Sequence, residues 1–291
     1  MEETKTSSDY CSNCGTPLLF PNKPCPACNK SNNGQISRQY INNNNSFPPS
    51  MVSSKENTYF YISLVVSVLL YILCVLSIVG ITYIIEFAIF FFMVQGFFIG
   101  NIRGNAIKIN QNQFPEIHDI AQVASVKLGL KKVPDIYVLQ SGGLLNALAT
   151  KFLDRDFVII YSDVLELGYK QGIDALEFII CHEFAHIKRK HLEKHLLLLP
   201  SLFIPFLGSA YSRACEYTCD RIAAYLQPKG AVEGLLVLAA GKELYSKVNI
   251  KEFILSAQSE SGFWSWVAEI YASHPHLYKR LKEVQVFLPN D

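Results

Sequence analysis

The sequence IICHEFAHIKRK, residues 179–190, decides the fold class and the chemistry that we expect of this chain. In an α-helix, residues four apart leave the same face about 6 Å apart along the axis, so His182 and His186 can bind one metal ion. Glu183 lies beside them, where it can take a proton from a metal-bound water. This pattern is typical of zinc hydrolases. The alternative is a helix that carries two histidines by chance.

A catalytic zinc needs a third protein ligand, commonly a glutamate, and keeps its fourth position for water. The segment RACEYTCDRI, residues 213–222, reads as a helix on which Glu216 and Asp220 share one face. Glu216 can supply the third ligand. Asp220 can accept a hydrogen bond from the other ring nitrogen of a ligand histidine. The two segments together predict a zinc peptidase centre.

Other histidines and cysteines near these segments have simpler interpretations. We expect His191 and His195 to lie on a solvated or membrane-surface face, because lysines and an arginine surround them. Cys215 and Cys219 lie about 100° from the Glu216 face of a helix, so we expect buried thiols rather than a second metal site. The same interpretation applies to Cys181.

The segment between the two motifs must bring them together. Residues 196–212 contain no charge, and Pro200 and Pro205 interrupt them. A single membrane crossing here would place Glu216 on the opposite side from His182, and 17 residues cannot cross twice. We therefore predict an apolar loop or re-entrant element that lies against the membrane and covers the active site.

Near the C-terminus, SHPHLYKRL (residues 273–281) carries further polar groups that suit hydrolysis of an acyl bond. A cation or an imidazole N–H can stabilise the oxyanion of a tetrahedral intermediate. His274 and Arg280 are candidates for this role, although their spacing also fits surface residues.

Four cysteines near the N-terminus, Cys11, Cys14, Cys25 and Cys28, form two C-x2-C pairs. This arrangement predicts a zinc ribbon with one structural zinc ion and a reducing, cytoplasmic compartment. The alternative is a nucleic-acid or protein-binding ribbon. Residues 1–30 hold three acids and three lysines, and the net charge is only +1, so we favour a structural or partner-docking ribbon and expect no nucleic acid. The polar first residues predict no cleavable signal peptide.

Residues 59–101 contain one formal charge, Glu86, and are long enough for two membrane spans with a turn near residues 80–82. Lys55 precedes them and Arg103 follows, which favours a hairpin in the cell membrane with both ends in the cytoplasm. We divide the chain into a zinc ribbon (1–30), a flexible Asn/Ser/Pro-rich linker (31–57), a transmembrane helical hairpin (58–102) and a peptidase domain (103–291).

The predicted peptidase domain is mainly α-helical with a small antiparallel sheet, an α+β arrangement. Residues 114–130 predict an amphipathic helix, and β-like runs cover 135–139, 146–150 and 157–162. The helix with the first motif starts near Asp174, with a capping box. If the run at 146–150 lies at the sheet edge, it can pair with an extended peptide, and an ordinary covered edge is the alternative.

The motifs HEFAH, EYTCD, NALAT and SHPHLYKR, after a membrane hairpin, resemble the HtpX-like family of membrane zinc metallopeptidases, which are gluzincins related to the CAAX prenyl protease. The resemblance covers about residues 100–285. It implies an endopeptidase that acts on polypeptides. The implied site residues are His182, His186 and Glu216 on zinc, Glu183 as general base, Asp220 behind a ligand, His274 and Arg280 beside the intermediate, and Asn146 and Ala147 as substrate-binding residues.

The chain departs from the family pattern in two ways. HtpX-like members have a second transmembrane hairpin between the two motifs, where this chain has a short apolar segment, and the zinc ribbon is an addition. Membrane proteins are the expected substrates in a quality-control role. The competing hypothesis is a membrane scaffold that recruits partners through the ribbon and has a structural or inactive metal site.

Overall fold

The computed structural model describes residues 48–140, 146–286 and 288, which belong to one compact unit, Phe47–Asp291. The predicted zinc ribbon and most of the predicted linker lie outside the described residues. The elements, in chain order, are η2 (Pro49–Met51), α2 (Ser54–Val75), α3 (Ile78–Asn105), β1 (Ile107–Lys108), α4 (Pro115–Leu128), β2 (Asp135–Leu139), β3 (Ala147–Phe152), β4 (Arg155–Tyr161), α5 (Ser162–Gln171), α6 (Asp174–Lys188), α7 (His191–Leu197), α8 (Leu199–Leu202), α9 (Leu207–Leu226), α10 (Ala231–Leu244), η3 (Tyr245–Lys247), α11 (Ile250–Ser259), α12 (Phe263–Tyr271) and α13 (Leu277–Gln285).

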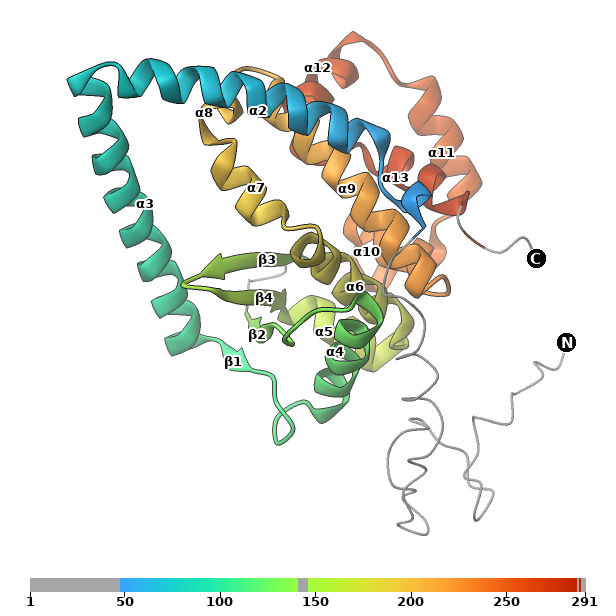
Figure 1. Ribbon diagram of the computed structural model, residues 1–291. Helices are drawn as coiled ribbons and strands as arrows, with labels where there is room; N and C mark the ends of the chain where they lie inside the picture. The colour runs from blue at the N-terminus through green and yellow to red at the C-terminus, as the bar shows by residue number, and fades with distance from the viewer. Residues whose placement is uncertain (1–47, 141–145, 287, 289–291) are drawn as a thin grey trace, which may run out of the picture. The chain divides into compact units, whose positions relative to one another are not determined.

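The fold class is confirmed: the described part of the chain is mostly helical, with one small sheet of four strands in the order β1-β2-β4-β3 (Figure 1). The sheet is mixed rather than antiparallel, because β2 and β4 run parallel. The short turn at Leu153 and Asp154 makes β3 and β4 an antiparallel hairpin, and β2 runs in the opposite direction to β3 and therefore parallel to β4. With β3 on one side of β4, β2 occupies the other side, and β3 becomes an edge strand.

The central strand β4 joins the two sides of the core, because successive side chains of a strand point to opposite faces. Val158 and Ile160 pack into the main core with α4 and α6, whereas Phe157 and Ile159 pack with Ile99 and Ile102 near the end of α3. The sheet is therefore fixed between the helical layer of the peptidase domain and the end of the second apolar helix.

Helix α6 lies in the centre of the core and begins at Asp174, as predicted. The predicted capping box is wrong: Ile173 is the N-cap residue, and its carbonyl accepts the N–H of Glu177. The helix ends at Lys188, and Lys190 has a left-handed backbone conformation that redirects the chain into α7. By contrast, α4 has the predicted Pro115 at its start and Gly129 at its C-cap.

Two helices, α2 and α3, are long and apolar enough to cross a membrane. They meet at residues 76–77, not at the predicted 80–82, and run apart from there (Figure 1). The Ser77 side chain caps α3 by accepting the N–H of Gly80 at 3.1 Å. A side chain at Gly80 would collide with the carbonyl of Cys74, so this glycine serves the close approach of the two helices.

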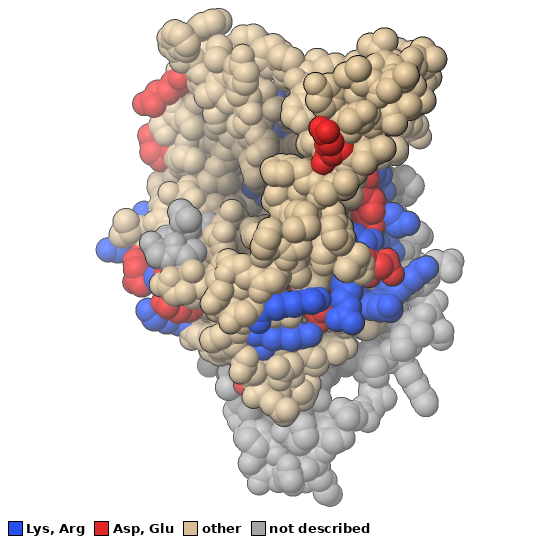
Figure 2. All heavy atoms as spheres, turned by 90° about the vertical axis from the view of Figure 1, so that its left-hand side faces the viewer, with Lys and Arg blue, Asp and Glu red and all other residues tan. Residues whose placement is uncertain are grey.

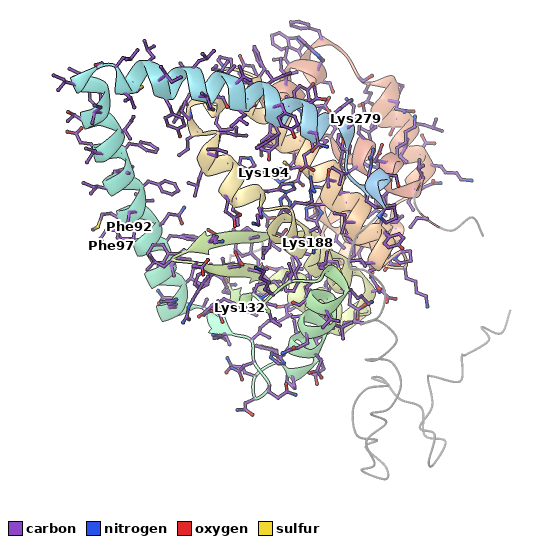
Figure 3. The ribbon with its side chains drawn as sticks, in the orientation of Figure 1. Phe92, Phe97, Lys132, Lys188, Lys194 and Lys279 are labelled. Atoms are coloured by element: carbon purple, nitrogen blue, oxygen red, sulfur yellow. The ribbon has the colours of Figure 1, made fainter. Side chains whose placement is uncertain are left out.

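The surface of α3 is strongly apolar. Phe92 and Phe97 both project from this helix (Figure 3), and Phe97 is 72% exposed. On the face that α3 presents in Figure 2, Lys and Arg side chains gather in the lower half.

The start of α2 lies inside the segment predicted as linker, and it packs on the peptidase domain. Met51 and Ser53 are buried, and the N–H of Ser53 donates to Oγ1 of Thr218 at 3.0 Å. Glu56 is fully buried. The structured unit therefore includes these residues.

Residues 196–212 connect helices that bring Glu216 beside His182 and His186, but they are not the predicted loop over the active site. They form the end of α7, helix α8 and the first residues of α9. The Ser67 hydroxyl on α2 donates to the carbonyl of Leu198 at 3.2 Å. None of the described residues that line the main cavity comes from this segment, so it joins α2 to the domain instead.

Candidate metal centre

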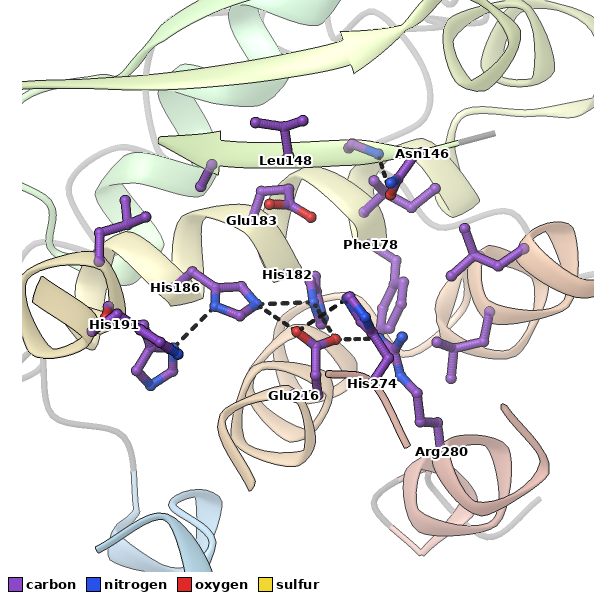
Figure 4. A pocket seen from close by; sticks show the side chains of 18 residues that line it. Asn146, Leu148, Phe178, His182, Glu183, His186, His191, Glu216, His274 and Arg280 are labelled. Carbon is purple, nitrogen blue, oxygen red and sulfur yellow. Dashed lines mark hydrogen bonds and ion pairs between the residues drawn. The ribbon is translucent and has the colours of Figure 1, made fainter. Parts of the chain in front are cut away.

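Helices α6 and α9 bring the three predicted ligands together (Figure 4). Nε2 of His186 lies 3.2 Å from Nε2 of His182 and 3.3 Å from Oε1 of Glu216. Nε2 of His182 lies 3.5 Å from Oε2 of Glu216. His182 and Glu216 are buried. Two ring nitrogens and the carboxylate of Glu216 thus converge.

These separations fit a tetrahedral ion. Ligand atoms that are about 2.0–2.1 Å from a zinc ion at tetrahedral angles lie about 3.3 Å from one another. The 3.2 Å between the two ring nitrogens and the 3.3 Å from Nε2 of His186 to Oε1 of Glu216 lie close to that value, and the 3.5 Å contact of His182 is to the other carboxylate oxygen, Oε2. Two imidazoles and one carboxylate leave one tetrahedral position for another group.

Asp220 lies one turn after Glu216 and is fully buried. Its Oδ1 lies 3.0 Å from Nδ1 of His182, and Arg280 donates to both of its oxygens at 2.7 Å. Burial alone would raise the pKa values of Asp220 and Glu216, but Arg280 and the neighbouring histidines together outweigh it and hold both below their usual range. Both carboxylates are therefore ionised at neutral pH, as a metal ligand and its orienting partner must be.

The second ligand histidine also has a partner behind it, which the sequence analysis missed. Nδ1 of His186 lies 3.1 Å from Nδ1 of His191, and Nε2 of His191 lies 3.2 Å from Oε1 of Glu56. The predicted solvated face is wrong for His191, which is 1% exposed, and His195 is mostly covered as well. Burial lowers the pKa of His191 to about 3, so the ring is neutral near pH 7.

The three cysteines near the ligands are buried thiols, as predicted. Burial raises the pKa of Cys181 to about 12 and raises those of Cys215 and Cys219 further. Cys219 and Cys215 each lie near His191 in a group that could hold an ion. A protonated thiol is a poor metal ligand, so the His182–His186–Glu216 group is the better candidate.

A cavity of about 280 Å³ opens beside the three ligands. Glu183 lies in it between β3 and the histidines (Figure 4). Phe178, Leu235 and Leu238 form an apolar part of its wall. The cavity therefore combines a place for an apolar side chain with a carboxylate beside the ligands.

The edge strand β3 forms another wall through residues 146–149. The carbonyl of Asn146 accepts the N–H of Tyr161 on β4. In an antiparallel pair, hydrogen bonding alternates along the strand, so the backbone groups of Ala147 and Ala149 point away from β4. The N–H of Ala147 indeed bonds to the side-chain oxygen of Asn146 at 2.9 Å. Backbone groups that do not pair with β4 thus lie on the edge of β3 that lines the cavity.

The two predicted oxyanion residues occupy different environments. Arg280 is buried against Asp220, and its Nη2 lies 3.3 Å from Oε2 of Glu216. The side chain of His274 is 62% exposed, lines the cavity and has its Nε2 3.6 Å from Oε1 of Glu216. The geometry gives Arg280 a supporting position behind the ligands and leaves His274 more accessible from the cavity.

This constellation is that of a metallopeptidase on a helical domain with a small sheet. The family model of peptidase family M48 matches residues 111–206 and 196–287, which together span more than half of the chain. The chain belongs to this family, and the resemblance stated from the motifs is confirmed at that level. No curated protein and no solved structure matched the chain.

Proposed function

We propose that this protein is a membrane-anchored zinc endopeptidase whose ion is held by His182, His186 and Glu216. The observation that carries the proposal is the convergence of two imidazole nitrogens and a carboxylate at 3.2–3.5 Å from one another, next to Glu183 and an edge strand. A zinc ion at this position would polarise the scissile carbonyl and lower the pKa of a water molecule.

Glu183 acts as the general base. Its carboxylate takes a proton from the attacking water and then delivers that proton to the nitrogen of the leaving amine. His274 donates an N–H to the oxyanion of the tetrahedral intermediate. Asp220 orients His182, and Arg280 holds Asp220 and Glu216 in place through their buried ion pairs.

The substrate is an extended polypeptide that pairs with β3. Ala147 and Ala149 offer backbone groups to the peptide, and Asn146 releases the Ala147 N–H when the substrate binds. The opposite wall of Phe178, Leu235 and Leu238 accepts an apolar side chain next to the cleaved bond. Apolar segments of membrane proteins fit this groove, which supports a role in membrane protein quality control.

The membrane anchor is the α2–α3 pair, in a multi-pass arrangement with both ends in the cytoplasm. Lys55 lies at the start of α2, and Arg103 and Lys108 lie at and after the end of α3. The zinc ribbon at residues 1–30, with Cys11, Cys14, Cys25 and Cys28, is a second zinc site and a place where a protein partner can dock.

The rival function is a membrane scaffold with a structural metal site. A structural zinc is usually closed by four protein ligands. The convergent group here offers three ligands beside a cavity that also contains Glu183, which supports hydrolysis.

Cleavage of casein by the detergent-solubilised full chain tests the proposal. We expect cleavage that a zinc chelator abolishes and that added zinc restores. Cleavage that continues in the chelator would contradict zinc dependence. For the orientation, a reporter fused to the C-terminus should be active in the cytoplasm, and activity on the other side would refute it.

A further inference from the structure

We infer that Glu56, in the first turn of α2, is a positioning residue for the metal centre and acts on the ligand His186 through His191. The inference rests on the proposed metal site and adds a second carboxylate-to-ligand connection to it. Asp220 orients His182 directly, whereas Glu56 reaches His186 through one intervening imidazole.

The contacts define one arrangement of protons along this chain. Nε2 of His186 points to the other two ligands, so its Nδ1 carries the proton. That N–H donates to Nδ1 of His191 at 3.1 Å. If His191 accepts at Nδ1, its own proton is on Nε2, which lies 3.2 Å from Oε1 of Glu56. Each donor therefore lies within reach of an acceptor, and this arrangement assigns one tautomer to each ring.

The carboxylate at the end of this chain is itself firmly held. Arg189 donates to Oε1 of Glu56 at 2.8 Å, and Lys194 donates to the same oxygen at 3.2 Å. Both cations come from the segment that follows the first motif, and Lys194 also lies over the Phe60 ring of α2. Glu56 is fully buried, so its charge is not screened by solvent.

His191 is not itself a ligand of the same ion. It contacts the Nδ1 side of the His186 ring, whereas the other two ligands lie on the Nε2 side. Its Nδ1 also lies 3.7 Å from the thiol of Cys219, which burial keeps protonated. The connection thus orients the ligand from behind and ties the start of the first apolar helix to the metal centre.

Three substitutions of His191 separate orientation from mere packing. The amide oxygen of Asn can take the place of Nδ1 and still accept from His186, whereas the amide nitrogen of Gln takes the place of Nε2 and reaches only Glu56. Phe keeps the ring volume and removes both contacts. His195→Gln is the matched control, because His195 is on the same helix and contacts no ligand of the proposed site.

The experiment measures zinc affinity by chelator competition and the absorption spectrum of the cobalt-substituted full chain in detergent. Every variant also carries Cys11→Ser, Cys14→Ser, Cys25→Ser and Cys28→Ser, so that the signal comes from the His182–His186–Glu216 site alone. Loss of a group behind a ligand typically weakens metal binding about 10–100-fold, and we expect this for His191→Phe. His191→Asn should bind zinc more tightly than His191→Gln, Glu56→Ala should weaken binding more than Glu56→Gln, and His195→Gln should leave the cobalt spectrum unchanged.

Wild-type zinc affinity and cobalt spectra in both His191→Phe and Glu56→Ala would overturn the inference. Equal losses in His191→Asn and His191→Gln, matched by equal losses of stability, would show a purely structural role and overturn it as well. A wild-type chain that binds no metal ion would instead overturn the proposed function together with this inference.

A second surface supports an independent inference: we propose that α12 lies in the water–lipid boundary of the bilayer. Its exposed side chains are apolar or aromatic, and its acid, Glu269, turns inward to Lys279. Trp264 is 78% exposed and Trp266 56% exposed. Trp and Tyr concentrate at this boundary, where one part of the side chain is in lipid and the other meets water.

The neighbours of α12 indicate that lipid, rather than a protein, covers this surface. The ring of Tyr271 contacts Phe206 at 5.0 Å in the uncharged segment that packs on α2. Arg213 on α9 donates to three carbonyls at the end of α12, so the helix is fixed beside the α2 end of the domain (Figure 1). The apolar surface therefore continues from α12 towards the proposed membrane anchor.

Both tryptophans of the chain are on α12, so tryptophan fluorescence, excited where tyrosine does not absorb, reports on this helix alone. In vesicles of phosphatidylcholine and phosphatidylglycerol, we expect brominated lipids to quench the emission of the full chain. Trp264→Phe and Trp266→Phe each leave one tryptophan, and we expect the emission of that tryptophan to be quenched in both variants. Unquenched emission in vesicles that contain the protein would overturn this inference but not the anchor, and failure of the protein to enter vesicles would overturn both.

Discussion

Replacement of Asp220 by Asn changes one charge and almost no volume, and it tests how the metal centre is held. Asp220 is fully buried, accepts two hydrogen bonds at 2.7 Å from Arg280 and lies 3.0 Å from Nδ1 of His182. An amide keeps one acceptor oxygen but turns an N–H₂ group towards a donor. Arg280 is then left with one anionic partner, Glu216.

The magnitude follows from these contacts. Removing one partner of a buried ion pair costs about 3–5 kcal/mol, and we expect the lower end because Asn keeps one acceptor. Loss of the group that orients a ligand histidine weakens metal binding about 10–100-fold, or about 1.4–2.7 kcal/mol.

The assay combines denaturant unfolding of the chelator-treated protein in detergent with zinc competition on the folded variant. Asp163→Asn is the matched control, because Asp163 pairs with Lys242 away from the metal centre. The control should lose some stability and no zinc affinity. Folded Asp220→Asn with wild-type zinc affinity would refute the orienting role of Asp220.

Three further predictions follow from the cavity. Ala149→Pro removes an edge N–H without removing a β4 hydrogen bond, so peptidase assays should show a higher KM with the fold retained in circular dichroism, and an unchanged KM would contradict substrate pairing with β3. His274→Ala should lower kcat about 10²–10³-fold with zinc still bound, and an unchanged kcat would exclude the oxyanion role. Leu238→Lys should reduce cleavage next to large apolar residues in a peptide library, whereas an unaltered library profile would show that this wall does not select the substrate.

The sequence was sufficient to predict that the three proposed ligands lie together, because helical spacing determines which side chains share a face. His182 with His186, and Glu216 with Asp220, are each four residues apart, and the helices place them as that spacing requires. Because a catalytic zinc needs a third protein ligand, the two helices were predicted to lie side by side before their packing was known.

The residues that the sequence did not predict depend on long-range packing. Glu56 is 130 residues before His186, in a polar stretch that resembles a linker, and its partners come from a different helix. His191 was assigned to solvent because its neighbours are basic, yet those cations face Glu56. The one local signal was the spacing of five between His186 and His191, which has no fixed meaning in a helix.

Three of the four strands of the sheet were predicted, without β1, and their directions were not. Local patterns identify β2, β3 and β4 as strands. The parallel pairing of β2 with β4 depends on the β3–β4 hairpin, which leaves the other edge of β4 open for β2. The turn between α2 and α3 was misplaced for a related reason: Gly80 looks like a turn residue in sequence, but it serves a close approach within the first turn of a helix.

The central claim is that Glu183 moves a proton in a zinc-dependent peptidase. The most direct measurement is casein cleavage by Glu183→Gln, with the zinc content of the same sample determined by atomic absorption. Gln keeps the shape of the side chain and cannot accept the proton, so we expect zinc at the wild-type level and a loss of cleavage of at least about 10²-fold. Cleavage at the wild-type rate by the zinc-loaded variant would contradict the claim.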